Sequence, residues 1–116
     1  MVNKTNQKCV FCEIVAGEIP SKKLWENEEF QAIENKFKDA PVHVLVIPKA
    51  HIAKAEQLRS TDGDFYGRIM SAVFEVVRVL ELDKKGFQLV YNGAGYNGIE
   101  HEHFHVLSGK KLLENT

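Results

Sequence analysis

The segment TDGDFYGRIMSAVFEVVRVLEL, residues 61–82, decides the fold class. Its apolar residues recur at spacings of three and four, as they do on one face of a helix. Thr61, followed three residues later by Asp64, predicts a capping box at the helix start. A helix face of this kind has to be buried, so we interpret the stripe as core packing. The stripe consists of Phe65, Ile69, Ala72, Val73, Val76 and Leu80.

Segments typical of strands lie on both sides of this helix. Before it, LWENEEFQAIEN (24–35) predicts two short strands around a polar turn, and PVHVLVIPK (41–49) predicts a third strand bounded by prolines. After it, GFQLVYN (86–92) and IEHEHFHVLSG (99–109) predict two more strands, with the glycine-containing loop GAGYNG (93–98) between them.

Two short helices complete the expected element order. CVFCEIVAGEIPS (9–21) predicts a short helix that Gly17 and Pro20 stop, and a second helical stretch is expected over residues 52–58. This order predicts an α+β domain with a mainly antiparallel sheet of about five strands, one long helix and a short N-terminal helix.

The chain totals restrict the class of protein. A length of 116 residues suits a single domain, 1–116, and 44% hydrophobic with 27% charged residues is the composition of a folded protein. A formal net charge of −1 favours neither nucleic acid nor an anionic membrane as a partner. No apolar run approaches the roughly 18 residues of a membrane helix, and MVNKTNQKCV lacks the apolar core of a secretory signal. We therefore expect a cytoplasmic protein.

The two cysteines are Cys9 and Cys12 of the CVFC motif. A pair spaced this closely does little to cross-link a fold, so a disulfide scaffold is not expected. In a reducing compartment, two close thiols either share a metal ion or carry out redox chemistry.

Three of the five histidines occur at alternate positions of HEHFHVL, residues 101–107. Side chains of a strand alternate between its faces, so His101, His103 and His105 would share one face, roughly 6.5 to 7 Å apart. On a helix, positions two apart diverge by about 200°. An alternating strand can carry an ordinary polar face, but three imidazoles in register favour a site. The opposite face holds Glu102, Phe104 and Val106.

Two kinds of chemistry use imidazoles this close together: metal binding and nucleophilic or acid–base catalysis. Two thiolates of CVFC and two imidazoles would complete a Cys2His2 zinc site and leave other histidines free. His51 is either a further candidate ligand or an ordinary surface residue at a helix start. His43, on an apolar strand, is either a hydrogen-bonded core residue or one that orients another imidazole.

These motifs together resemble the histidine triad (HIT) family over nearly the whole chain. HEHFHVL resembles the family's His-x-His-x-His signature, in which x is apolar, except that Glu102 is charged. Residues 9–30 are similar to the family's N-terminal region, and PVHVLVIPKAHI (41–52) to its central strand and the Pro-Lys-x-His turn that follows. The resemblance implies the histidine triad fold.

The resemblance also implies an activity and a metal. The activity is that of a nucleotidyl hydrolase or transferase acting on purine nucleoside 5'-phosphates joined to a leaving group, such as phosphoramidates, adenylates or dinucleoside polyphosphates. By position, His103 would attack the α-phosphorus and form a covalent nucleotidyl-histidine, His105 would contact the phosphate oxygens, and His43 would assist. Bacterial-type relatives hold a zinc ion, whose four ligands correspond here to Cys9, Cys12, His51 and His101. An ion with four protein ligands has a structural role.

The nucleotide contacts follow from the same resemblance, with departures. Asn35 stands where relatives have an aspartate that binds ribose hydroxyls, and Asn97 and Gly98 stand where Gln and Ser or Thr are common. Backbone N–H groups of the glycine-containing loop would meet the phosphate, unless that loop is a plain turn. Relatives commonly dimerise through the long helix and an edge strand, so a homodimer is expected. The implied contact residues are Ile14, Asn35, Asn92, Asn97, Gly98 and His105.

Two other classes of function remain open on the sequence. The first is a zinc-stabilised module that binds a nucleotide or a protein without turnover. The second is a thiol oxidoreductase using CVFC, which is disfavoured because no strand precedes the motif and a metal would occupy its thiols.

Overall fold

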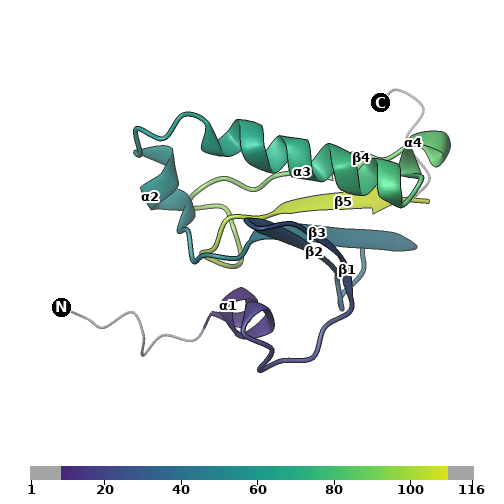
Figure 1. Ribbon diagram of the computed structural model, residues 1–116, viewed down its shortest axis with the longest axis horizontal. Helices are drawn as coiled ribbons and strands as arrows, with labels where there is room; N and C mark the ends of the chain where they lie inside the picture. Colours follow the sequence, from purple (N-terminus) through teal and green to yellow (C-terminus); the bar gives the residue numbers. More distant parts are fainter. Residues whose placement is uncertain (1–8, 110–116) are drawn as a thin grey trace.

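The computed structural model describes residues 9–109, and a five-stranded antiparallel sheet forms its central layer (Figure 1). The strand order is β1-β2-β3-β5-β4. The strands are β1 Lys23–Glu26, β2 Phe30–Glu34, β3 Val42–Pro48, β4 Gln88–Val90 and β5 Phe104–Ser108. The helices are α1 Val10–Val15, α2 Lys54–Leu58, α3 Phe65–Val79 and α4 Leu82–Lys85. The predicted α+β class with a mainly antiparallel sheet is confirmed.

The sheet is covered on both faces, by α3 on one and by α1 on the other (Figure 1). The two-residue period of β3 explains how one strand serves both layers. Val44 and Val46 pack in the cluster that α3 covers, whereas Leu45 and Ile47 pack with Phe11 of α1. A strand buried on both sides has an almost continuous apolar sequence, and β3 is apolar apart from His43.

The apolar stripe of α3 is buried as predicted, with Leu80 packed against the same cluster just beyond the helix end. The predicted capping box is wrong. The helix begins at Phe65, and its N-cap residue, Asp64, makes no side-chain capping bond. Instead, Asp62 Oδ1 accepts a hydrogen bond from the Asp64 N–H at 3.2 Å, so a local turn replaces the reciprocal cap with Thr61.

The last strand is shorter than predicted, because residues 99–103 lie outside β5. The β3–β5 ladder pairs Val44 with Val106 and Val46 with Phe104, so two residues further on the same register would place Pro48 opposite Glu102. Proline has no N–H to contribute to a ladder, and the pairing stops there. The Glu102 N–H donates to the Ile52 carbonyl at 2.7 Å instead.

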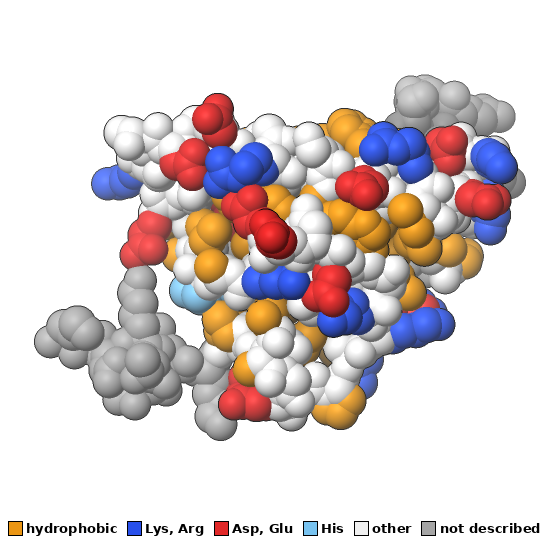
Figure 2. All heavy atoms as spheres, in the orientation of Figure 1, with side chains coloured by type: hydrophobic (Ala, Val, Ile, Leu, Met, Phe, Trp, Pro, Cys, Tyr) orange, Lys and Arg blue, Asp and Glu red, His pale blue; other side chains and the backbone are white. Residues whose placement is uncertain are grey.

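The surface carries both signs of charge. On the face shown in Figure 2, acidic and basic side chains lie interspersed and form no continuous field of one sign. Within residues 9–109, every helix is too short or too polar to cross a bilayer.

Candidate functional site

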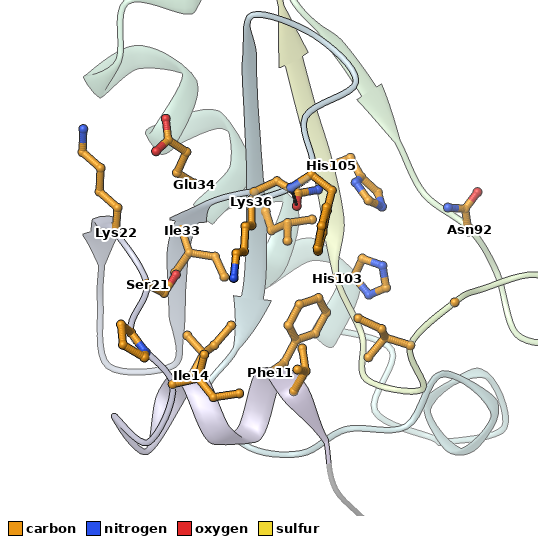
Figure 3. Close-up of a pocket in the computed structure, with 18 residues that line it drawn as sticks. Phe11, Ile14, Ser21, Lys22, Ile33, Glu34, Lys36, Asn92, His103 and His105 are labelled. Carbon is orange, nitrogen blue, oxygen red and sulfur yellow. Dashed lines mark hydrogen bonds between the residues drawn. The ribbon is translucent and has the colours of Figure 1, made fainter.

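A pocket of about 930 Å³ opens on the α1 side of the sheet. Apolar side chains of α1, β2 and β3 form much of its wall, while His103 just before β5, His105 in β5 and Asn92 after β4 supply polar groups (Figure 3). A mostly apolar pocket with a few convergent polar groups is the usual form of a small-molecule site. The apolar wall consists of Val10, Phe11, Ile14, Ile19, Pro20, Ile33, Phe37, Leu45 and Ile99.

The backbone sets the tautomer of His103. Its Nδ1 lies 2.7 Å from the His101 carbonyl oxygen, which can only accept, so Nδ1 carries the proton. The lone pair of the ring is therefore on Nε2. The side chain is 4% exposed, and the edge of the Phe11 ring contacts it with centroids 5.1 Å apart. Burial lowers the pKa of His103 to about 4, so the imidazole is neutral at neutral pH.

A second backbone group sets the tautomers of two more histidines. The Asp39 N–H donates to His43 Nδ1 at 3.0 Å, so His43 carries its proton on Nε2. That Nε2 lies 2.8 Å from His105 Nδ1 and donates to it. His105 must then carry its own proton on Nε2, as a donor. Burial lowers the pKa of both His43 and His105, which keeps the pair neutral. The sequence predicted that His43 could orient another imidazole without naming it, and in the structure its neighbour is His105.

Cys9, Cys12, His51 and His101 form a compact cluster beside the pocket. One ligand atom from each lies within 4.8 Å of all the others. Cys9 Sγ is 3.4 Å from His101 Nδ1, and Cys12 Sγ is 3.2 Å from His51 Nδ1 and 3.6 Å from His101 Nδ1. With zinc–sulfur bonds of about 2.3 Å and zinc–nitrogen bonds of about 2.0 Å, tetrahedral ligand atoms lie roughly 3.3 to 3.8 Å apart. The group could therefore hold a metal ion with little movement.

The surroundings of the cluster also suit a metal. His101 Nε2 lies 2.9 Å from the Pro48 carbonyl oxygen, so Nε2 carries the proton and Nδ1 has a lone pair to donate. A carbonyl bonded to the far nitrogen is the usual partner of a metal-binding histidine. Burial and the neighbouring Cys9 thiol raise the pKa of Cys12 to about 11, so this thiol becomes a thiolate only with a cation nearby.

The structure places the predicted nucleotide contacts unequally. Ile14, Asn35, Asn92 and Gly98 line the pocket together with His103 and His105. Asn97 lies outside the lining: its Nδ2 donates to the Ile99 carbonyl at 2.8 Å and to Glu100 at 2.9 Å. The Asn35 Oδ1 accepts from the Phe37 N–H at 2.9 Å. Its Nδ2 lies 3.1 Å from His43 Nε2, but both atoms carry protons, so this contact is not a hydrogen bond.

Two features of the site escaped sequence reasoning. Phe11 contacts the rings of both His101 and His103 and so joins the cysteine–histidine cluster to the pocket. Its spacing of three from Ile14, on the same short helix, was the available signal. The second feature is a buried polar cluster behind the triad, centred on Glu102, whose charge at an apolar position of the motif marked it in the sequence.

Comparison with known proteins identifies the family. The HIT domain profile matches residues 16–112. An uncharacterized HIT-like protein of Helicobacter pylori is 39% identical over 104 residues, which are 88% of this chain and 97% of that protein. The adenosine 5'-monophosphoramidase of Candida albicans is 32% identical over 114 residues, covering 91% of this chain and 73% of that protein.

Solved structures agree with the sequence comparison. The structure of a histidine triad protein from Clostridium difficile matches with a TM-score of 0.81 at 32% identity, over 91% of this chain and 94% of that one. The chain belongs to the HIT family.

Proposed function

We propose that this protein is a nucleotidyl hydrolase or transferase that cleaves purine nucleoside 5'-phosphates joined to a leaving group, through a covalent intermediate on His103. The observation that carries the proposal is the neutral His103 ring, with its proton held on Nδ1 by a carbonyl and its lone pair on Nε2 at the pocket. The similarity to a relative named adenosine 5'-monophosphoramidase supports a nucleotide phosphoramidate as substrate.

The reaction takes two displacements at one phosphorus. First, the His103 Nε2 lone pair attacks the α-phosphorus, an N–P bond forms, and the bond from phosphorus to the leaving group breaks. The leaving group departs with the bonding pair and takes a proton from solvent. Water then attacks the same phosphorus, the N–P bond breaks, and its electron pair returns to Nε2 while the water proton goes to solvent. Imidazole suits both steps because it is a neutral nucleophile and also a leaving group.

Charge on the phosphate would be met by donors around His103. His105 presents an Nε2–H because His43 occupies its Nδ1, so it can donate to a phosphate oxygen. Asn92 lies on the chain after β4 and lines the same pocket (Figure 3). Donors fixed before the substrate arrives need no reorganisation during the reaction, and this is the property that stabilises developing charge.

We further propose that the ion of the cysteine–histidine cluster is zinc and that its role is structural. Cys9, Cys12, His51 and His101 supply four ligand atoms, which fills a tetrahedral shell and leaves no position for substrate. When bound, the ion ties the start of α1 to the chain before β5. Thiolate ligands need reduced cysteines, so we place the protein in the cytoplasm.

A homodimer is also proposed. Phe74 and Val79 of α3 are 41% and 55% exposed, and β4 is an edge strand of the sheet. Exposed apolar side chains and an edge strand are features that a second copy would cover.

A substrate panel tests the proposed function. Adenosine and guanosine phosphoramidates, adenylates and dinucleoside polyphosphates would be offered to the wild type and to His103→Ala, with hydrolysis and binding measured in parallel. We expect turnover of at least one class by the wild type and its loss in the variant, with nucleotide binding retained. Tight binding by the wild type without hydrolysis of any compound would favour a binding module.

A further inference from the structure

A charged residue occupies an apolar position of the triad motif, and its partners come from α2, from α3 and from the segment after β4. The Glu102 carboxylate is fully buried behind the triad, on the α3 side of the sheet. It pairs with Lys54 of α2, also fully buried, at 3.3 Å, and accepts hydrogen bonds from Tyr66 of α3 at 2.8 Å and from Tyr91, after β4, at 2.9 Å. The Lys54 ammonium also lies over the Tyr91 ring, 3.8 Å from its centroid.

This cluster adjoins a piece of chain that lacks strand pairing. The β5 ladder begins at Phe104, so residues 101–103, which carry His103 and one candidate metal ligand, have no ladder bonds. Helix α2 and the residues leading into it hold this segment instead. The Glu102 N–H donates to Ile52, Glu100 accepts from the Ala55 N–H at 3.0 Å, and Lys54 Nζ donates to the His103 carbonyl at 3.4 Å.

Stability alone does not account for this arrangement. Burying an ion pair costs desolvation that its attraction often fails to exceed, so an apolar group of similar volume is often as stable or more stable. The ion pair instead fixes the positions of the groups around it. Glu102 binds Lys54 and two tyrosines, and Lys54 binds Glu102 and the His103 carbonyl. The ammonium is the group in this cluster that reaches the main chain of His103 itself.

We infer that Lys54 and Glu102 are positioning residues of the site: they hold the unpaired segment 101–103 so that the His103 imidazole stays aligned with the substrate phosphorus. Glu102 also links this segment to Tyr91, which directly precedes the pocket residue Asn92. One carboxylate therefore fixes the spacing between the nucleophile and a phosphate contact. The inference rests on the proposed function for its kinetic consequence.

The double variant Lys54→Met/Glu102→Gln is the main test. It removes both charges together, keeps a side-chain oxygen to accept from the tyrosines, and removes the donor to the His103 carbonyl. We expect a folded, metal-loaded protein in which kcat falls by about 10- to 100-fold while KM is unchanged, because small misplacements of a reacting group have effects of this size. Glu102→Gln alone keeps the Lys54 donor and should retain more of kcat than the double variant.

A readout independent of activity separates this inference from the proposed function. Amide hydrogen exchange should speed up in residues 101–103 of the double variant and stay at the wild-type rate in β3. If the wild type turns over no substrate, the proposed function fails and the exchange result alone decides the inference. A double variant whose residues 101–103 exchange at the wild-type rate would overturn the inference. So would a double variant with the wild-type kcat, where turnover exists.

Tyr91→Phe and Tyr66→Phe provide a matched pair in case the double variant does not fold. Each removes one phenol donor from the same carboxylate, and Tyr91 alone of the two adjoins Asn92. The inference requires Tyr91→Phe to lower kcat, or to speed exchange at residues 91–92, clearly more than Tyr66→Phe. Equal effects of the two substitutions would contradict it.

Discussion

His51→Ala separates a metal ligand from an ordinary surface histidine. His51 is exposed, and its ring contacts Cys12 Sγ at 3.2 Å and the His101 ring with centroids 5.0 Å apart. Replacing an exposed residue with so few contacts normally changes the free energy of unfolding by less than about 0.5 kcal/mol. Structural zinc, in contrast, contributes about 10 to 16 kcal/mol in small peptides, so losing one of four ligands should cost several kcal/mol.

The structure also indicates what would remain without the ion. Helix α1 has six residues and is too short to be stable alone. Its one fully buried side chain is Phe11, whose burial contributes about 1.5 to 3 kcal/mol. The partly buried Ile14 and Val15 pack on the same cluster, so the proposed ion would add to an attachment that these apolar contacts already provide.

Urea unfolding of the wild type and His51→Ala, each with and without a chelator, measures this contribution. We expect the chelator to destabilise the wild type by several kcal/mol and to have a much smaller effect on the variant, with zinc content by atomic spectroscopy falling in parallel. A variant within about 0.5 kcal/mol of the wild type, together with an unchanged wild type under chelation, would refute the metal assignment.

Three further predictions concern stability and assembly. Burial lowers the pKa of His43 from its ordinary 6.5, so the unfolded chain takes up the proton at higher pH than the folded one. The contribution of the neutral His43 imidazole to the free energy of unfolding is therefore complete above about pH 6.5. It is lost as the pH falls through the folded-state pKa of His43. His43→Asn should accordingly flatten the decline in unfolding free energy between pH 7.5 and 5.5, and a decline parallel to that of the wild type would count against the assignment. Phe11→Ala should cost about 3 to 5 kcal/mol in urea unfolding at saturating zinc, because the ring is 3% exposed; a loss below about 1 kcal/mol would show that α1 does not need it. Phe74→Glu should convert the proposed dimer to monomers in sedimentation velocity, and a wild type that already sediments as a monomer would remove the dimer proposal.

Periodicity made much of the fold predictable. The apolar stripe of α3 and the apolar run of β3 are local sequence patterns, and residues of both are buried in the same core cluster. The alternation of HEHFHVL placed its side chains on the correct faces, with His105 toward the pocket and Val106 toward α3. Where the strand starts was not predictable from that alternation, because Pro48, on the neighbouring strand, ends the ladder.

The site was predictable in composition but not in its proton positions. The resemblance named the four residues of the cysteine–histidine cluster, and the structure brings them together. The tautomers of His43 and His101 depend on the Asp39 N–H and the Pro48 carbonyl. These are backbone groups, so the residue types at positions 39 and 48 do not reveal them. The partners of Glu102 lie 11, 36 and 48 positions away, beyond the reach of any local pattern.

Mass spectrometry of protein quenched during turnover tests whether His103 is the nucleophile. With a substrate from the panel that is hydrolysed, we expect a wild-type species heavier by one nucleotidyl group. The added mass should map to the peptide that contains His103 and be absent from His103→Ala. Turnover with no such species at any quench time, or an adduct on another residue, would contradict the claim that His103 is the nucleophile.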